Sequence, residues 1–188
     1  MNEQELFLKH KYRLINLAIG SSAMRQQGTK NAIQEIRNVL YDEDIEKFKM
    51  ALHENKFLIY LDDLTNFIFE KLHASHKLQW GAVRKALNLY FRDIFYSSYF
   101  CKKIMLDQSL ISQLEIPLDS FTGKGIIEDY SKIANCSIKW TTIKSLTPQK
   151  SKQVQEMAQM VNSTIYKLPA IVDLDLVYWR RPNIDADL

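Results

Sequence analysis

Residues 80–100 read WGAVRKALNLYFRDIFYSSYF, and the spacing of the apolar residues in this stretch decides the fold. The apolar side chains recur at steps of four, three and four, which is one face of a helix: Val83, Leu87, Tyr90 and Ile94. The opposite face, which we expect to point away from the core, carries small and polar residues: Gly81, Lys85, Asn88 and Arg92. About 20 residues at 1.5 Å each give a helix of about 30 Å, long enough to cross a small domain.

Helical spacing extends over most of the chain on both sides of this stretch. Residues 56–72 carry a second apolar stripe at steps of four and three: Phe57, Leu61, Leu64, Ile68 and Leu72. Helical spacing or helix-start signals also appear at 4–19, 30–40, 42–55, 120–134, 147–165 and 172–179. No segment has the strict alternation of a convincing strand. We therefore expect an all-α protein in which residues 1–188 form a single compact helical domain.

The composition favours the same fold class. With Gly 5 and Pro 4 among 188 residues, the chain has too few turn residues for a β-sandwich or barrel. Hydrophobic residues at 46% and charged residues at 25% exclude a disordered chain. The formal net charge of +3 is compatible with a polyanionic partner such as nucleic acid, but it does not require one.

Several classes of protein are excluded because their motifs are missing. Cys101 and Cys136 form no CxxC pair, so neither an iron–sulfur cluster nor a cysteine-based zinc site is expected. No Walker lysine loop, GxGxxG or GxSxG occurs. The acidic start Met1–Glu5 lacks the basic region of a secretory signal, and no apolar run reaches the roughly 18 residues of a membrane span. We expect a cytoplasmic monomer with no cofactor, metal or membrane partner.

Four residues are candidates for function, although each has an ordinary structural explanation. Lys85 could be a solvated lysine, and Asp119, two residues after a proline, could be a helix cap. Asp175 could be a first-turn carboxylate and Trp179 a core aromatic residue. Their order along the chain is what favours a functional interpretation.

A lysine on a long helix, followed by a Pro-hydrophobic-Asp segment that starts the next helix, resembles the helix-hairpin-helix DNA glycosylase superfamily. Here that segment is Ile116-Pro117-Leu118-Asp119, and Lys85 precedes its aspartate by 34 positions. This long gap is most similar to the archaeal 8-oxoguanine DNA glycosylase branch. That branch also ends with an aspartate four residues before a tryptophan, as Asp175 and Trp179 stand here.

The resemblance implies a role for each of the four candidates. Asp119 is the carboxylate that stabilises positive charge on the sugar while the glycosidic bond breaks. Lys85 is the amine that attacks the sugar carbon and forms a Schiff base, which permits strand cleavage. Asp175 accepts hydrogen bonds from the edge of a flipped base, and Trp179 stacks on its ring.

The implied partner is double-stranded DNA with one base flipped out of the duplex, held by a rim of basic residues: Lys77, Arg84, Arg92, Arg180 and Arg181, with Lys102, Lys103 and Lys124 also available. The resemblance covers about residues 56–181, and Trp140 matches an upstream tryptophan of that branch. The glycine-rich hairpin of the classical members is absent, since only Gly81 follows Trp80. Small residues near Lys85 are expected to leave room for a DNA backbone.

The resulting hypothesis is a DNA glycosylase, a hydrolase with lyase activity, acting in base excision for DNA repair or for defence against modified DNA. The alternative is a non-catalytic helical DNA-binding or protein-interaction module on the same scaffold. The residues do not say which base is removed, since Asp175 could accept from a guanine or from a cytosine.

Overall fold

The computed structural model of the chain describes residues 2–179. Its α-helices are α1 (Glu3–Ala18), α2 (Lys30–Asp42), α3 (Ile45–His53), α4 (Phe57–His76), α5 (Trp80–Tyr96), α6 (Ser98–Lys103), α7 (Ser120–Ala134), α8 (Pro148–Val161) and α9 (Leu174–Tyr178). Short 3₁₀ turns are η1 (Gln108–Gln113), η2 (Ile143–Ser145) and η4 (Ile171–Asp173), and a π-helical turn, η3 (Asn162–Tyr166), follows α8. Residues 2–179 contain no β-strand, so the predicted all-α fold is confirmed. None of these helices is both long and apolar enough to span a membrane.

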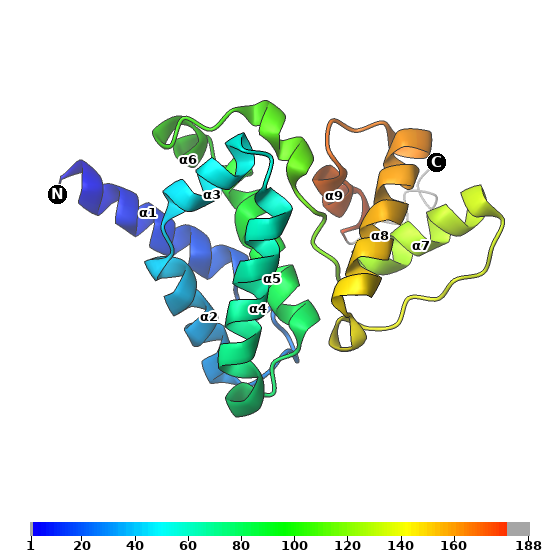
Figure 1. Cartoon of the computed structure of the whole chain (residues 1–188), viewed down its shortest axis with the longest axis horizontal. Helices are drawn as coiled ribbons and strands as arrows, with labels where there is room; N and C mark the ends of the chain where they lie inside the picture. The colour runs from blue at the N-terminus through cyan, green and yellow to red at the C-terminus, as the bar shows by residue number, and fades with distance from the viewer. Residues whose placement is uncertain (1, 180–188) are drawn as a thin grey trace, which may run out of the picture.

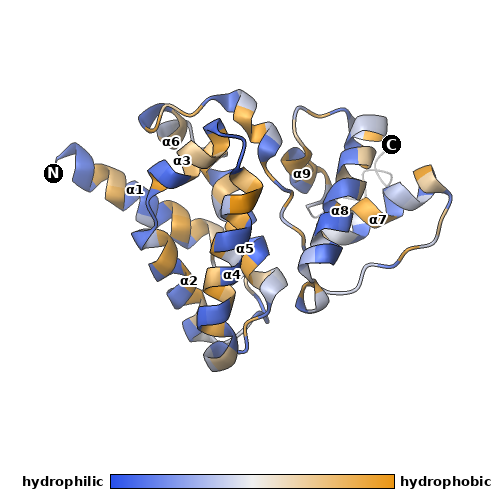
Figure 2. Ribbon diagram, viewed as in Figure 1, coloured by the Kyte–Doolittle hydropathy of each residue, from blue (hydrophilic) through white to orange (hydrophobic). Residues whose placement is uncertain are grey.

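Helix α5 runs through the middle of the molecule, between two groups of helices (Figure 1). One group is α1 to α4 with α6, and its hydrophobic cluster includes the stacked rings of Phe48 and of Phe91 from α5, 4.6 Å apart. The other group is α7, α8 and α9, with a smaller cluster of its own. Phe69 and Trp140 pack against both clusters and bridge them. Most of the helices carry apolar residues on one side and polar residues on another (Figure 2), as burial of one face requires.

The second face of α5 is buried, contrary to expectation. Lys85 is 9% exposed and Asn88 is 3% exposed, because α8 and η2 pack against α5 and the segment around Ala23 covers Lys85. Gly81 is buried as well, and a Cβ atom there would collide with the carbonyl of Ile143 and the side chain of Leu146. The space expected for a DNA backbone beside Gly81 is therefore filled by the protein's own chain.

Two helix ends also differ from the predicted ones. Helix α4 continues to His76, since the polar stretch 73–77 contains neither glycine nor proline, and it ends at Lys77 in the left-handed conformation (φ 53°). Helix α5 ends at Tyr96 instead of reaching Phe100. The side chain of Ser97 accepts a hydrogen bond from the amide of Phe100 and starts α6 in a new direction.

Candidate active site

A pocket of about 430 Å³ lies where α1, α5, α7 and α9 meet. It brings together the four residues on which the resemblance rests: Lys85, Asp119, Asp175 and Trp179. They come from three different elements, 94 positions apart in the sequence from first to last. Their convergence is a property of the fold that helical spacing alone does not produce.

Lys85 projects from α5 into this pocket with its ammonium group held on two sides. The Nζ atom donates a hydrogen bond to the carbonyl of Ala23 at 3.0 Å and lies 3.4 Å from Oδ2 of Asp119. Ala23 belongs to the segment between α1 and α2, which closes one wall of the pocket. A freely solvated lysine is thus the wrong interpretation, because Lys85 is buried, paired and directed at a carboxylate.

Asp119 uses its two carboxylate oxygens for two purposes. Its Oδ1 accepts hydrogen bonds from the amides of Phe121 (2.8 Å) and Thr122 (3.1 Å) and so caps α7. The hydroxyl of Thr122 in turn accepts from the Asp119 amide at 2.7 Å, which completes a capping box. Oδ2 remains directed toward Lys85. The cap fixes the carboxylate in one orientation without using the oxygen that faces the pocket.

Asp175 lies in the pocket wall on α9, is 5% exposed, and is paired with Arg92. Nη1 of Arg92 donates to Oδ2 of Asp175, while Nε and Nη2 bind Asp93 at 2.9 and 2.7 Å. Burial raises the pKa of Asp175 to about 6, with Asp119 raising it further while Arg92 and Lys85 oppose the shift. At neutral pH most of this carboxyl is therefore an acceptor-only carboxylate.

The rim of the pocket is apolar. Trp179 is 58% exposed on this rim, so its interpretation as a core residue is wrong. Three more large side chains stand exposed around the same opening: Leu17, Phe121 and Leu176. A charged floor beneath exposed apolar side chains suits a ligand with a flat apolar ring and a polar edge, because each part meets its own kind of surface.

Two residues of the predicted basic rim, Arg84 and Arg92, are engaged by carboxylates within the protein. Arg84 is 4% exposed, and its Nε and Nη2 bind both oxygens of Glu115 at 2.8 and 2.9 Å. Its Nη1 lies 2.7 Å from Asp62, so Arg84 joins parts of the protein and has no access to a phosphate. Arg92 is committed to carboxylates as well. Lys77 is exposed at the end of α4, and Arg180 and Arg181 lie outside the described residues.

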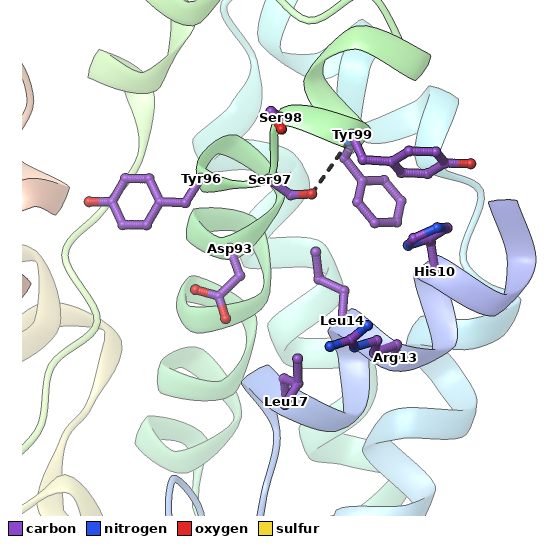
Figure 3. A pocket seen from close by; sticks show the side chains of 10 residues that line it. His10, Arg13, Leu14, Leu17, Asp93, Tyr96, Ser97, Ser98 and Tyr99 are labelled. Carbon is purple, nitrogen blue, oxygen red and sulfur yellow. Dashed lines mark hydrogen bonds between the residues drawn. The ribbon is translucent and has the colours of Figure 1, made fainter.

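A second pocket of about 450 Å³ borders the first and shares Leu17 and Asp93 with it. Figure 3 shows that α1 forms one side of it and the junction of α5 and α6 the other. His10 from α1 stacks on Tyr99 with the ring centres 4.1 Å apart, and Arg13 lines the pocket nearby. No lysine is among its lining residues, so the pair of nucleophile and carboxylate distinguishes the first pocket as the candidate site.

Two parts of the site were not predicted from the sequence. Arg92 was assigned to phosphate, although its position seven residues after Lys85 places both on one helix face and could have associated it with the site. Nothing in the sequence could have predicted that the backbone carbonyl of Ala23 binds Lys85, since every residue carries a carbonyl. Among the described residues no group of three or more histidine, cysteine or acidic side chains is arranged to hold a metal ion.

Comparison with known proteins adds nothing to these observations, because no protein-family model, curated protein or solved structure matches the chain. The relation to the glycosylase superfamily thus remains a resemblance carried by the residues quoted above and by their place in one pocket.

Proposed function

We propose that the protein is a DNA glycosylase with lyase activity, which removes a base flipped from duplex DNA. The observation that carries this proposal is the pair of Lys85 Nζ and Asp119 Oδ2, 3.4 Å apart in a pocket that Asp175 and Trp179 also line. A primary amine, a fixed carboxylate, a base-reading acceptor and an exposed indole are the groups that this reaction requires.

The pocket supplies each step from its own residues. Trp179 stacks on the flipped base, and Asp175 accepts hydrogen bonds from its edge. Lys85 must lose a proton before it attacks, and Oδ2 of Asp119 is positioned to take it. The nitrogen of Lys85 then bonds to C1′ of the sugar as the glycosidic bond breaks, and the proton passes from Asp119 to the departing base. The adduct opens to a Schiff base as a proton moves from its nitrogen to the ring oxygen, and loss of a C2′ proton to water with departure of the 3′ phosphate then nicks the strand.

Borohydride trapping tests the proposal directly. Incubation with a duplex that carries an abasic site, in the presence of borohydride, should give a covalent protein–DNA adduct. Lys85→Gln should abolish the adduct while the protein remains folded. Salt-dependent DNA binding with no adduct would instead support the non-catalytic DNA-binding module.

The identity of the base requires a panel of duplexes. By resemblance, the first substrate to test is 8-oxoguanine, in keeping with repair. Modified cytosines are the second group, in keeping with removal of modified bases from foreign DNA. Release of one base and not the others, lost in Asp119→Asn, would define the substrate. A wild-type protein that traps on abasic DNA but releases no base from any duplex would leave only the lyase half of the proposal standing.

A further inference from the structure

Arg92 stands at the point where α5 meets α9, between two carboxylates. Its guanidinium binds Asp93 on its own helix and Asp175 on α9, and it lies over the ring of Tyr96 at 5.9 Å. The hydroxyl of Tyr96 donates to Asp173, just before α9, at 2.7 Å. Arg92 and Tyr96, one turn apart on α5, therefore both bind the segment from Asp173 to Asp175.

Helix α9 depends on such contacts for its position. It has five residues, too few for a helix that is stable on its own. From the other side Tyr178 donates to Asp129 of α7 at 2.9 Å, and Leu174 at the start of α9 is buried in the hydrophobic cluster shared with α7 and α8. Apolar packing thus holds the backbone of α9, and Arg92 is the side chain that binds the carboxylate of Asp175.

We infer that Arg92 is a positioning residue: by binding Asp175 while Asp93 holds its other edge, it sets the orientation of the base-reading carboxylate relative to Lys85. The inference rests on the proposed function. Along α5, Lys85 and Arg92 are two turns apart, about 10 Å, so one rigid helix carries both the nucleophile and the group that places the base. A phosphate-binding role for Arg92 is disfavoured because both edges of its guanidinium are engaged by carboxylates.

The guanidinium also acts on the charge state of Asp175. The charged groups around this carboxylate are Arg92 and Lys85 from α5 and Asp119 at the start of α7. Two further carboxylates belong to the same network: Asp93 accepts from Arg92, and Asp173 accepts from Tyr96. Removal of Arg92 takes away the larger of the two cationic influences, so the carboxyl should ionise only at higher pH.

The two halves of the reaction separate positioning from phosphate binding. Release of a base needs Asp175, whereas Schiff-base formation at a preformed abasic site does not, because no base is present. A residue that positions Asp175 therefore affects base release far more than abasic trapping. A residue that binds phosphate affects both, and its loss reduces the salt dependence of DNA binding.

The experiment compares Arg92→Met and Arg92→Lys with wild type on two probes, an abasic duplex and a duplex carrying the base that wild type releases from the panel. Arg13→Met is the matched control, since Arg13 is an exposed arginine that lines only the neighbouring pocket. For Arg92→Met we expect base release to fall about tenfold more than abasic trapping. A difference of this size corresponds to the loss of one charge-assisted hydrogen bond. The pH at which base release becomes half-maximal should be higher in Arg92→Met than in wild type. Arg92→Lys should restore this pH more fully than it restores the rate of base release. Arg13→Met should leave the ratio of the two rates unchanged.

Four results would count against the inference. Equal losses on both probes with a shallower salt dependence would make Arg92 a phosphate contact. Base release by both Arg92 variants at the wild-type rate and with the wild-type pH profile would leave Arg92 no role. Equal losses with a lowered melting temperature in both variants would reduce it to a structural residue. Wild-type protein that neither traps nor releases any base would overturn the proposed function itself, and the inference with it.

Discussion

At the scale of single residues, Asp119 separates a structural duty from a chemical one. Asparagine keeps the oxygen that caps α7 but loses the negative charge toward Lys85. Asp119→Asn should therefore melt close to wild type and lose base release by two orders of magnitude or more, about 3 kcal/mol of transition-state stabilisation. Asp119→Ala should lose the cap as well and about 1 kcal/mol of stability. Thermal melts and single-turnover release on the same preparations test both. Normal release by the asparagine variant would reduce Asp119 to a cap.

Asp175 gives stability and activity opposite dependences on pH. The pKa of Asp175, about 6, is raised above its value in the unfolded chain. Its contribution to the free energy of unfolding is therefore fully favourable below pH about 4 and is lost as the pH rises through 6. Asp175→Asn should therefore gain stability relative to wild type between pH 4 and 7, by about 2–3 kcal/mol at most. Base release by wild type should fall below pH 6, because the protonated carboxyl no longer accepts on both oxygens. Melting curves and a pH–rate profile measure the two trends, and a flat melting difference would contradict the first.

At the scale of elements, α7 connects the catalytic carboxylate to the base-reading helix. Asp119 caps its start, and Gly125 one and a half turns later lies against the ring of Tyr178 on α9. A Cβ atom at Gly125 would collide with that ring, so Gly125→Ala should push α9 outward and cost about 1–3 kcal/mol despite alanine's better helix propensity. Base release should fall more than abasic trapping. Glu128→Ala, at an exposed position on α7, is the control and should change neither. Wild-type behaviour of Gly125→Ala would mean that α9 does not depend on this contact.

The elements were predictable to the extent that local spacing determines them. The stripe from Val83 to Ile94 specifies α5 because burial of one face needs only that periodicity. Ser97 ends the helix through a side-chain cap that competes with continued periodicity, so the predicted end was too late. The burial of Lys85 could not be predicted from spacing, since its ammonium group is held by Ala23, 62 positions earlier in the chain, and by Asp119, 34 positions later.

At the scale of the whole molecule, Arg84 joins the two helical groups. It links α5 and α4 to Glu115, in the segment that leads to Asp119, and Asn88 adds a third donor to the same carboxylate. Arg84→Met should lower stability by about 3–5 kcal/mol, because Glu115 would be left buried without its ion partner. Arg84→Met/Glu115→Met should recover part of the loss, and Lys77→Met should stay within about 0.5 kcal/mol of wild type. Denaturant unfolding measures these differences. An Arg84→Met protein as stable as wild type would contradict the structural role.

The charges that line the site pocket also determine which small molecules can enter it. Two cations and three carboxylates face it, so its fixed charge is negative when all are ionised. A phosphate group is repelled from such a cavity, whereas an uncharged ring is not. Free nucleobase should therefore inhibit base release at concentrations at which the matching 5′-monophosphate does not, and added salt should narrow the difference. Equal inhibition by both would contradict this. Nucleotides in the cell should therefore not occupy the pocket. The base just released should instead act as a product inhibitor and slow the next turnover.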